Sequence, residues 1–195
     1  MRIIAGAAKG RNISSVASAT RPTSDRAREA LFSSLASEFG EFAGLNILDL
    51  YAGTGAIALE ALSRGAAMVS AVERDERAQK AISQNYEGIK SAQCPGKFNL
   101  YAMAVHRFLQ DKSLTRYHFI YIDPPYDISD IDIVETLIQL RDGGYVHPDG
   151  LIAIERNSRV KEISWPVGFE QLREKTYGQA RIFYGICAHF EPENG

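Results

Sequence analysis

Asp49, Glu73 and Asp123 each stand at the end of a short apolar run of the sequence. Where such runs alternate with helical stretches they form a parallel sheet, and ligands bind at the carboxyl ends of its strands. One acidic residue at such an end often does no more than cap the next helix. Three of them, each with a distinctive neighbourhood, predict a ligand site along one edge of a sheet.

The neighbourhood of Asp49 continues through Tyr51 to Gly53-Thr54-Gly55. Two glycines separated by one residue allow the backbone to turn tightly and approach a ligand, and the following helix offers N–H donors at its start. Glu73, which Arg74 follows, has two oxygens that can accept hydrogen bonds from both hydroxyls of a ribose. These residue types predict a nucleoside-containing cofactor.

Two cofactors fit this pattern. A glycine loop with an acid 20 residues after Gly53 matches the fingerprint of dinucleotide-binding enzymes, so an NAD-dependent oxidoreductase is an alternative. A pyrophosphate beside Asp49 would be repelled, whereas the ammonium group of S-adenosylmethionine (SAM) would be attracted. The motif therefore favours SAM.

The neighbourhood of Asp123 is Asp123-Pro124-Pro125-Tyr126. The two prolines fix two φ angles and hold Asp123 in an extended conformation. The Asp123 carboxylate and the Pro124 carbonyl can then accept the two N–H bonds of an exocyclic amino group, while Tyr126 stacks on the base. The alternative is a simple turn after a buried strand, with Asp123 as a turn former. The residue types favour a site for a planar base.

Alternating strands and helices must position these residues. Strands are expected at Asn46–Tyr51, Met68–Glu73, Phe98–Met103, Phe119–Ile122 and Leu151–Glu155, with a terminal antiparallel hairpin of Phe169–Lys175 and Ala180–Phe190. Helices are expected from Thr23 or Ser24 to Phe39 and at Gly55–Arg64, Asp75–Lys90, Val105–Asp111 and Ile131–Arg141. This alternation predicts an α/β fold with a mostly parallel seven-stranded sheet. Residues 1–20 are expected to form a small basic β-hairpin extension, from 3–5 and 12–16, and residues 21–195 the main domain.

The charge is distributed unevenly along the chain. Residues 1–30 hold six basic and two acidic groups, although the whole chain of 195 residues has a formal net charge of −2. Such a basic segment indicates a polyanionic partner, with a merely solvated terminus as the alternative. Arg28 lies on the apolar side of the first expected helix, so its side chain either extends to solvent or points into a site.

Other classes of protein are disfavoured by the composition. No apolar run approaches the ~18 residues of a membrane span, and the start of the chain does not have the pattern of a secretory signal. The two cysteines, far apart in the sequence, are expected to be reduced thiols of a cytoplasmic protein. Four isolated histidines give no metal-ligand pattern, so no metal is expected.

Taken together, these motifs resemble the RsmD family, the guanine-N2 methyltransferases of bacterial 16S ribosomal RNA. The resemblance covers nearly the whole chain and is carried by residues 2–6, 9–11, 21–32, 48–55, 59–66 and 123–126. Its most family-specific part is the Arg-Pro-Thr-x-Asp-Arg-x-Arg-Glu segment that begins at Arg21. The resemblance implies a Rossmann-like methyltransferase fold, SAM as cofactor, and 16S rRNA or the assembling small ribosomal subunit as partner. We also expect a monomer with no membrane attachment and no obligate protein partner.

The resemblance also implies roles for individual residues. Those expected to carry the chemistry are Asp123, Pro124 and Tyr126. Those expected to bind SAM are Asp49, Tyr51, Gly53, Thr54, Gly55, Glu73, Arg74, Ala104, Val105 and Asp123. Those expected to bind the substrate are Arg2, Lys9, Arg11, Arg21, Thr23, Arg26, Arg28, Pro125 and Tyr126. Arg21, Arg26 and Arg28 are equally open to a contact with the SAM carboxylate.

The sequence departs from the family pattern at one place. Many relatives carry Asp or Asn followed by Ala near the SAM adenine, whereas this chain has Ala104-Val105, which leaves a backbone contact from Val105. Three other functions stay open at this level: a DNA adenine-N6 or cytosine-N4 methyltransferase, an NAD-dependent oxidoreductase, and an RNA-binding module without catalysis.

Overall fold

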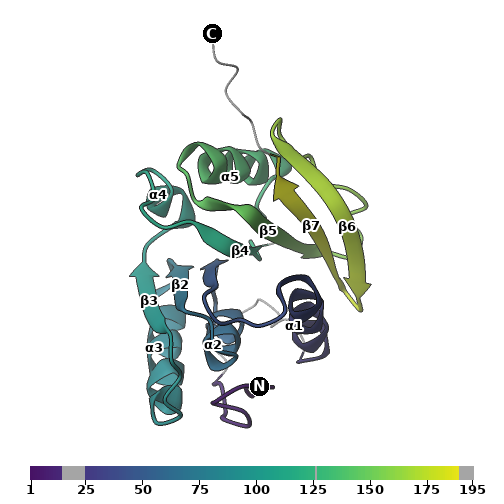
Figure 1. Cartoon of the computed structure of the whole chain (residues 1–195). Helices are drawn as coiled ribbons and strands as arrows, with labels where there is room; N and C mark the ends of the chain where they lie inside the picture. Colours follow the sequence, from purple (N-terminus) through teal and green to yellow (C-terminus); the bar gives the residue numbers. More distant parts are fainter. Residues whose placement is uncertain (15–24, 126, 189–195) are drawn as a thin grey trace.

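The computed structural model describes residues 1–14, 25–125 and 127–188 (Figure 1). Its helices are α1 Asp25–Phe39, α2 Ala56–Ser63, α3 Glu76–Lys90, α4 Val105–Phe108 and α5 Asp130–Asp142. Its strands are β1 Asn46–Leu50, β2 Met68–Glu73, β3 Lys97–Ala102, β4 Tyr117–Ile122, β5 Val146–Asn157, β6 Phe169–Tyr177 and β7 Ala180–Cys187. None of the helices in these ranges is both long enough and apolar enough to span a bilayer.

The seven strands form one mixed sheet in the order β3-β2-β1-β4-β5-β7-β6. Strands β1 to β5 pair in parallel, while β7 pairs antiparallel with both β5 and β6. This arrangement confirms the predicted α/β fold and its terminal antiparallel hairpin. Several elements differ in length from the prediction, most clearly α4, which is a single turn, and β5, which begins at Val146, where its register with β4 is irregular.

Helices cover both faces of the sheet (Figure 1). Successive residues of a strand point to opposite faces, so Ile47 of β1 joins the core under α1, α2 and α3, whereas Leu48 and Leu50 join the core under α4 and α5. A strand buried on both faces must be apolar throughout, which explains the continuous apolar runs in the sequence.

The start of α5 is fixed by a capping box. The Ser129 hydroxyl accepts a hydrogen bond from the Asp132 N–H, and the Asp132 carboxylate accepts one from the Ser129 N–H. This reciprocal pair satisfies two backbone donors that the first turn of a helix leaves unpaired.

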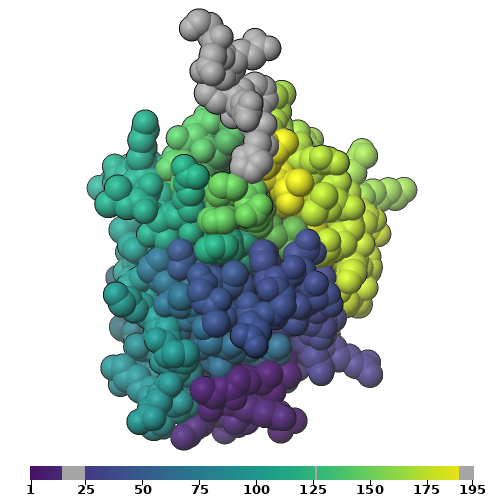
Figure 2. Space-filling model, in the orientation of Figure 1, coloured from purple at the N-terminus to yellow at the C-terminus, as the bar shows by residue number. Residues whose placement is uncertain are grey.

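The N-terminal residues 1–14 pack directly on the main body of the molecule (Figure 2). Their only isolated β-bridge in the described range joins Arg2 to Asn12, a smaller hairpin than the one expected. Ile3 and Ile13 are buried in the core on the α1–α3 face. The expected boundary after residue 20 lies outside the described residues.

Hydrogen bonds to α2 hold this N-terminal segment in place. The Glu60 carboxylate accepts from the Ile4 and Ala5 N–H groups at 2.7 and 3.0 Å. The Ser63 hydroxyl accepts from the Ala8 N–H at 2.9 Å. Since Ser63 ends α2, Ala7 and Ala8, which bond to Ser63, lie at the opposite end of this helix from the glycine loop that precedes it.

Candidate active site

The three acidic neighbourhoods meet at one edge of the sheet. In the register of the central strands, Leu50 lies beside Val72 on β2 and beside Ile122 on β4. The pairing continues past the strand ends, because the Ala52 N–H donates to the Val72 carbonyl at 3.0 Å. The Asp123 N–H in turn donates to the Leu50 carbonyl at 3.4 Å. Neighbouring strands lie about 4.8 Å apart, so Glu73, the Tyr51–Gly55 loop and Asp123 follow one another in a short row.

The Tyr51–Gly55 loop, here called the cofactor loop, has an unusual backbone. Tyr51 has a φ angle of 62°, in the left-handed region that residues other than glycine rarely adopt, and such strain is commonest at functional sites. Gly55 has a φ of 75°, and a Cβ built on it would lie 3.3 Å from the Ile82 side chain of α3. Glycine at position 55 therefore allows both the turn and the close packing of α3 on the loop.

Glu73 supports the cofactor loop from β2. One of its carboxylate oxygens accepts from the Gly53 N–H at 2.8 Å, and the other accepts from the Asp75 N–H at 2.8 Å. Each carboxylate oxygen has a second lone pair, so this fixed carboxylate can still accept hydrogen bonds from the hydroxyls of a ribose.

Asp49 lies beneath the cofactor loop. Its side chain is 1% exposed and accepts a hydrogen bond at 3.1 Å from the Ala58 N–H in the first turn of α2. Burial raises the pKa of this carboxyl to about 7, and the negative charge of Glu73 adds to the effect in spite of the Ala58 N–H. A cation brought beside Asp49 would favour its ionised form.

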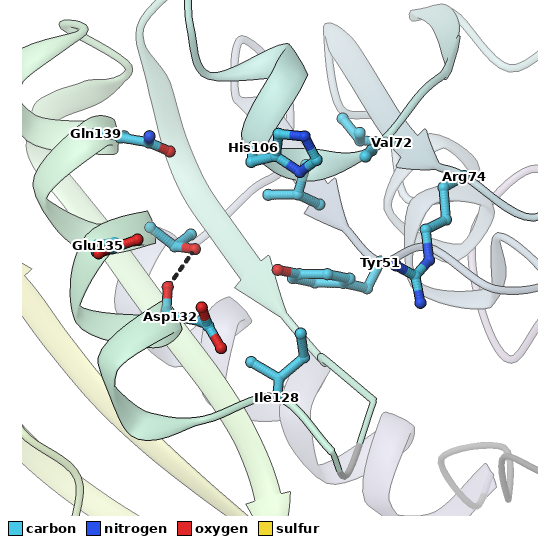
Figure 3. A pocket seen from close by; sticks show the side chains of 11 residues that line it. Tyr51, Val72, Arg74, His106, Ile128, Asp132, Glu135 and Gln139 are labelled. Atoms are coloured by element: carbon cyan, nitrogen blue, oxygen red, sulfur yellow. Dashed lines mark hydrogen bonds between the residues drawn. The ribbon is translucent and has the colours of Figure 1, made fainter.

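A pocket of about 170 Å³ opens beside this row of residues, on the α4 and α5 face of the sheet (Figure 3). It is lined by Tyr51, Val72, Arg74, Ala104, Val105, His106, Ile128, Asp132, Glu135, Thr136 and Gln139. Four residues expected to bind the cofactor, Tyr51, Arg74, Ala104 and Val105, thus come together from three separate parts of the chain. Gly53, Thr54, Gly55, Glu73 and Asp123 are not among its lining residues and belong to the adjoining edge.

The α5 side of this pocket was missed by the sequence analysis. Asp132, Glu135, Thr136 and Gln139 follow the helical spacing i, i+3, i+4 and i+7, which places them on one side of α5. Polar residues at this spacing, directly after a motif expected to bind a base, were the available signal. Figure 3 shows the Tyr51 ring reaching across the pocket toward this helix. Burial raises the pKa of the Tyr51 hydroxyl, which keeps it a neutral hydrogen-bonding group.

The Asp-Pro-Pro motif ends β4 next to the cofactor loop. Asp123 and Pro125 are partly exposed, Pro124 is buried, and Tyr126 lies outside the described residues. The chain after the motif is held by Arg156, whose guanidinium donates to the Ile128 carbonyl at 3.1 Å and lies 3.5 Å from the Asp130 carboxylate.

The basic residues expected to bind the substrate are divided between surface and interior. Arg2, Lys9, Arg11 and Arg26 are exposed, and Arg11 donates to the Ser91 hydroxyl at the end of α3. The first three belong to the N-terminal segment, which lies on the opposite side of the molecule from α4 and α5 (Figure 1). Arg21 and Thr23 lie outside the described residues.

Arg28, also expected among the substrate contacts, lies in the interior of the structure. It is 0% exposed and is not one of the residues that line the pocket. Its guanidinium donates to the Asp25 carboxylate at 3.0 Å and to the Arg2 carbonyl, and its Nε lies 3.9 Å from the Glu60 carboxylate. Arg28 thus attaches the N-terminal segment to α1 and α2.

Comparison with known proteins adds a family to this geometry. Residues 1–186 match the family described as Conserved hypothetical protein 95. The chain is 34% identical over 182 residues to YlbH of Bacillus subtilis (strain 168), and this match covers 91% of this chain and 94% of that protein. It is 33% identical over 180 residues to Ribosomal RNA small subunit methyltransferase D of Escherichia coli (strain K12), and this match covers 92% of this chain and 86% of that protein.

A solved structure agrees with these sequence matches. The structure of yhhF from Escherichia coli matches with a TM-score of 0.81 at 29% identity, over 96% of this chain and 98% of that one. With the three acidic strand ends and the Asp-Pro-Pro motif side by side at one edge of the sheet, these matches show that the chain belongs to the RsmD family of methyltransferases.

Proposed function

We propose that this chain transfers the methyl group of SAM to the exocyclic N2 amino group of a guanine in bacterial 16S ribosomal RNA. The guanine implied by the family is nucleotide 966, methylated during assembly of the small subunit. The observation that carries the proposal is the direct adjacency of the cofactor loop and the Asp-Pro-Pro motif on β1 and β4. A methyl donor held by one and an amino group held by the other would meet at the same edge.

The residues present fit SAM as the cofactor. Glu73 is already oriented by two backbone N–H groups and suits the ribose hydroxyls. Asp49 suits the ammonium of the methionine part, and its neutral form at low pH avoids an uncompensated buried charge. The pocket beside Val72, Ala104 and Val105 suits an adenine, with the Val105 backbone as its polar contact. SAM supplies a methyl group activated by its sulfonium.

The Asp-Pro-Pro motif suits the amino group of the substrate. A guanine amino nitrogen is a weak nucleophile because its lone pair is conjugated with the ring. The Asp123 carboxylate and the Pro124 carbonyl would accept its two N–H bonds, turning the lone pair toward the methyl group and stabilising the positive charge that develops on nitrogen. The base must first leave any stack, at a cost of a few kcal/mol.

The RNA is proposed to contact the exposed basic residues Arg2, Lys9, Arg11 and Arg26. Three of them belong to the N-terminal segment, whose residues 7 and 8 bond to Ser63 at the end of α2 remote from the cofactor loop, so we expect these residues to bind RNA away from the target nucleotide. We expect the enzyme to act as a monomer in the cytoplasm, where ribosomal subunits assemble.

The deciding experiment uses labelled SAM with unmodified ribosomal RNA, small subunits and DNA, followed by digestion to nucleosides and mass spectrometry. Label in N2-methylguanosine is the expected result, and the better acceptor identifies the assembly stage. Label in N6-methyladenine or N4-methylcytosine would overturn the substrate while keeping the site chemistry. Failure to bind SAM, together with binding of NADH, would instead support the oxidoreductase.

A further inference from the structure

Asn85 is a buried polar residue in the middle of α3 that none of the roles above uses. It is 4% exposed. Asparagine is a poor residue for a helix interior, and an amide buried without hydrogen bonds is costly. Its position therefore calls for partners, and these lie on two other parts of the chain.

The side chain of Asn85 forms three hydrogen bonds. Its amide nitrogen donates to the Thr54 carbonyl at 3.0 Å and to the Ser14 carbonyl at 3.2 Å. Its amide oxygen accepts from the Ser14 N–H at 2.8 Å. Both N–H bonds of the amide are thus used, one on the cofactor loop and one on the N-terminal segment. This single amide joins two regions that are 40 residues apart in sequence.

The contact with Thr54 completes the support of the cofactor loop. Glu73 accepts from the Gly53 N–H on the side of β2, and Asn85 donates to the Thr54 carbonyl on the side of α3. One helical turn before Asn85, Ile82 packs against Gly55. Helix α3 therefore holds the loop at two points, one polar and one apolar, and any shift of the loop is transmitted to Asn85.

The contacts with Ser14 occur at the end of the N-terminal segment nearest to the site. The rest of this segment is attached to the far end of α2 through Glu60 and Ser63. Asn85 accordingly is its link to the cofactor loop, and Arg2, Lys9 and Arg11 are exposed on the same segment.

We propose that Asn85 is a positioning residue that couples the cofactor loop to the N-terminal segment, so that filling the cofactor site tightens the Ser14 end of the segment. The inference rests on the cofactor part of the proposed function and not on the identity of the RNA. By linkage, a second ligand that tightens the segment would raise the affinity for the cofactor, and the cofactor would raise the affinity for that second ligand by the same factor.

The first test uses the wild-type protein and S-adenosylhomocysteine, the product that remains after methyl transfer. Hydrogen exchange followed by NMR should show slower exchange of the Ser14 amide, along with that of Gly53, when the ligand binds. Protection of Gly53 with no change at Ser14 would overturn the coupling. If the ligand protects neither amide and does not bind in calorimetry, the cofactor part of the proposed function fails and the inference fails with it.

The second test uses Asn85→Asp, which keeps the oxygen acceptor and removes both N–H donors. We expect about a tenfold weaker affinity for S-adenosylhomocysteine and loss of the Ser14 protection. Because a protonated carboxyl regains one donor, the affinity relative to wild type at the same pH should recover as the pH falls. Gln84→Glu, the same change at the exposed neighbouring position, is the matched control and should show neither effect.

A purely structural role predicts a different pattern. Asn85→Asp would then lower the unfolding temperature while leaving ligand affinity and its pH dependence as in wild type, and that result would refute the proposal. If Asn85→Asp does not fold, Asn85→Ala replaces it, since alanine favours the helix, and the same loss of Ser14 protection is expected.

Discussion

At the scale of single residues, the site depends on carboxylates in contrasting surroundings. Asp49 is buried under the cofactor loop, whereas Asp123 is partly exposed where β4 ends. Burial makes the charge of Asp49 sensitive to pH near neutrality, while the exposure of Asp123 leaves it accessible to an incoming amino group. The two residues should therefore respond differently to substitution.

Asp123→Ala should lower kcat by a factor of at least ~10², because a positioned acceptor contributes about this factor to the rate. The affinity for S-adenosylhomocysteine should stay within a few-fold of wild type. Single-turnover kinetics and calorimetry measure the two quantities. Asp127→Ala, at an exposed position four residues later, should keep normal turnover. Full activity of Asp123→Ala would remove Asp123 from the reaction.

The affinity for S-adenosylhomocysteine should decline as the pH falls below about 7. The pKa of Asp49 is raised to about 7 without ligand, and a bound ammonium favours the ionised carboxylate. Binding below this pKa must then release a proton, so affinity falls up to tenfold per pH unit as the solution becomes more acidic. Calorimetry should show the acidic decline in wild type and its loss in Asp49→Asn.

At the scale of elements, the row of strand ends was predictable, while the contacts between distant elements were not. Parallel strands end at a common edge, so apolar runs ending in Asp49, Glu73 and Asp123 suffice to bring these residues together. Arg28 shows the limit of this reasoning. Its place on the apolar side of α1 was predictable, but its burial depends on Glu60 of α2, a partner that periodicity within one helix cannot identify.

The loop between the Asp-Pro-Pro motif and α5 depends on β5 in the same way. Arg156→Met removes the hydrogen bond to the Ile128 carbonyl and the ion pair with Asp130, so the loop loses its support from β5. We expect kcat to fall about tenfold, while the unfolding temperature changes little. Steady-state kinetics on Arg156→Met and on the exposed control Arg159→Met test this expectation. Equal kinetics of the two variants would contradict it.

At the scale of the whole molecule, the N-terminal segment is packed into the main core. Gly6 and Gly10 have almost the same φ, 83° and 84°, but a Cβ on Gly6 would lie 1.9 Å from the Ser63 carbonyl, whereas a Cβ on Gly10 meets no atom within 4 Å. Gly10→Ala should therefore cost about 1–2 kcal/mol of unfolding free energy from backbone strain alone. Gly6→Ala should cost clearly more, because the segment must also move off α2.

Urea unfolding of the two variants measures this difference, and equal stabilities would mean that the segment contributes nothing to the folded core.

The same packing bears on RNA binding, because exposed cations on a fixed surface make a fixed number of phosphate contacts. A plot of the logarithm of the RNA association constant against the logarithm of the salt concentration should have a slope of about −0.7 for each phosphate contact. A flat response would exclude the N-terminal segment as the RNA grip.

The attachment of the first residues to α2 and α3 also affects how the chain matures on the ribosome. Ile4 bonds to a residue 56 positions later, and Ser14 to one 71 positions later. At about 5–20 residues per second, the N-terminus must wait several seconds for these partners to be synthesised. These N-terminal residues therefore stay unpaired until α2 and α3 have been synthesised, and during that interval Ile3 and Ile13 are exposed to water and to chaperones.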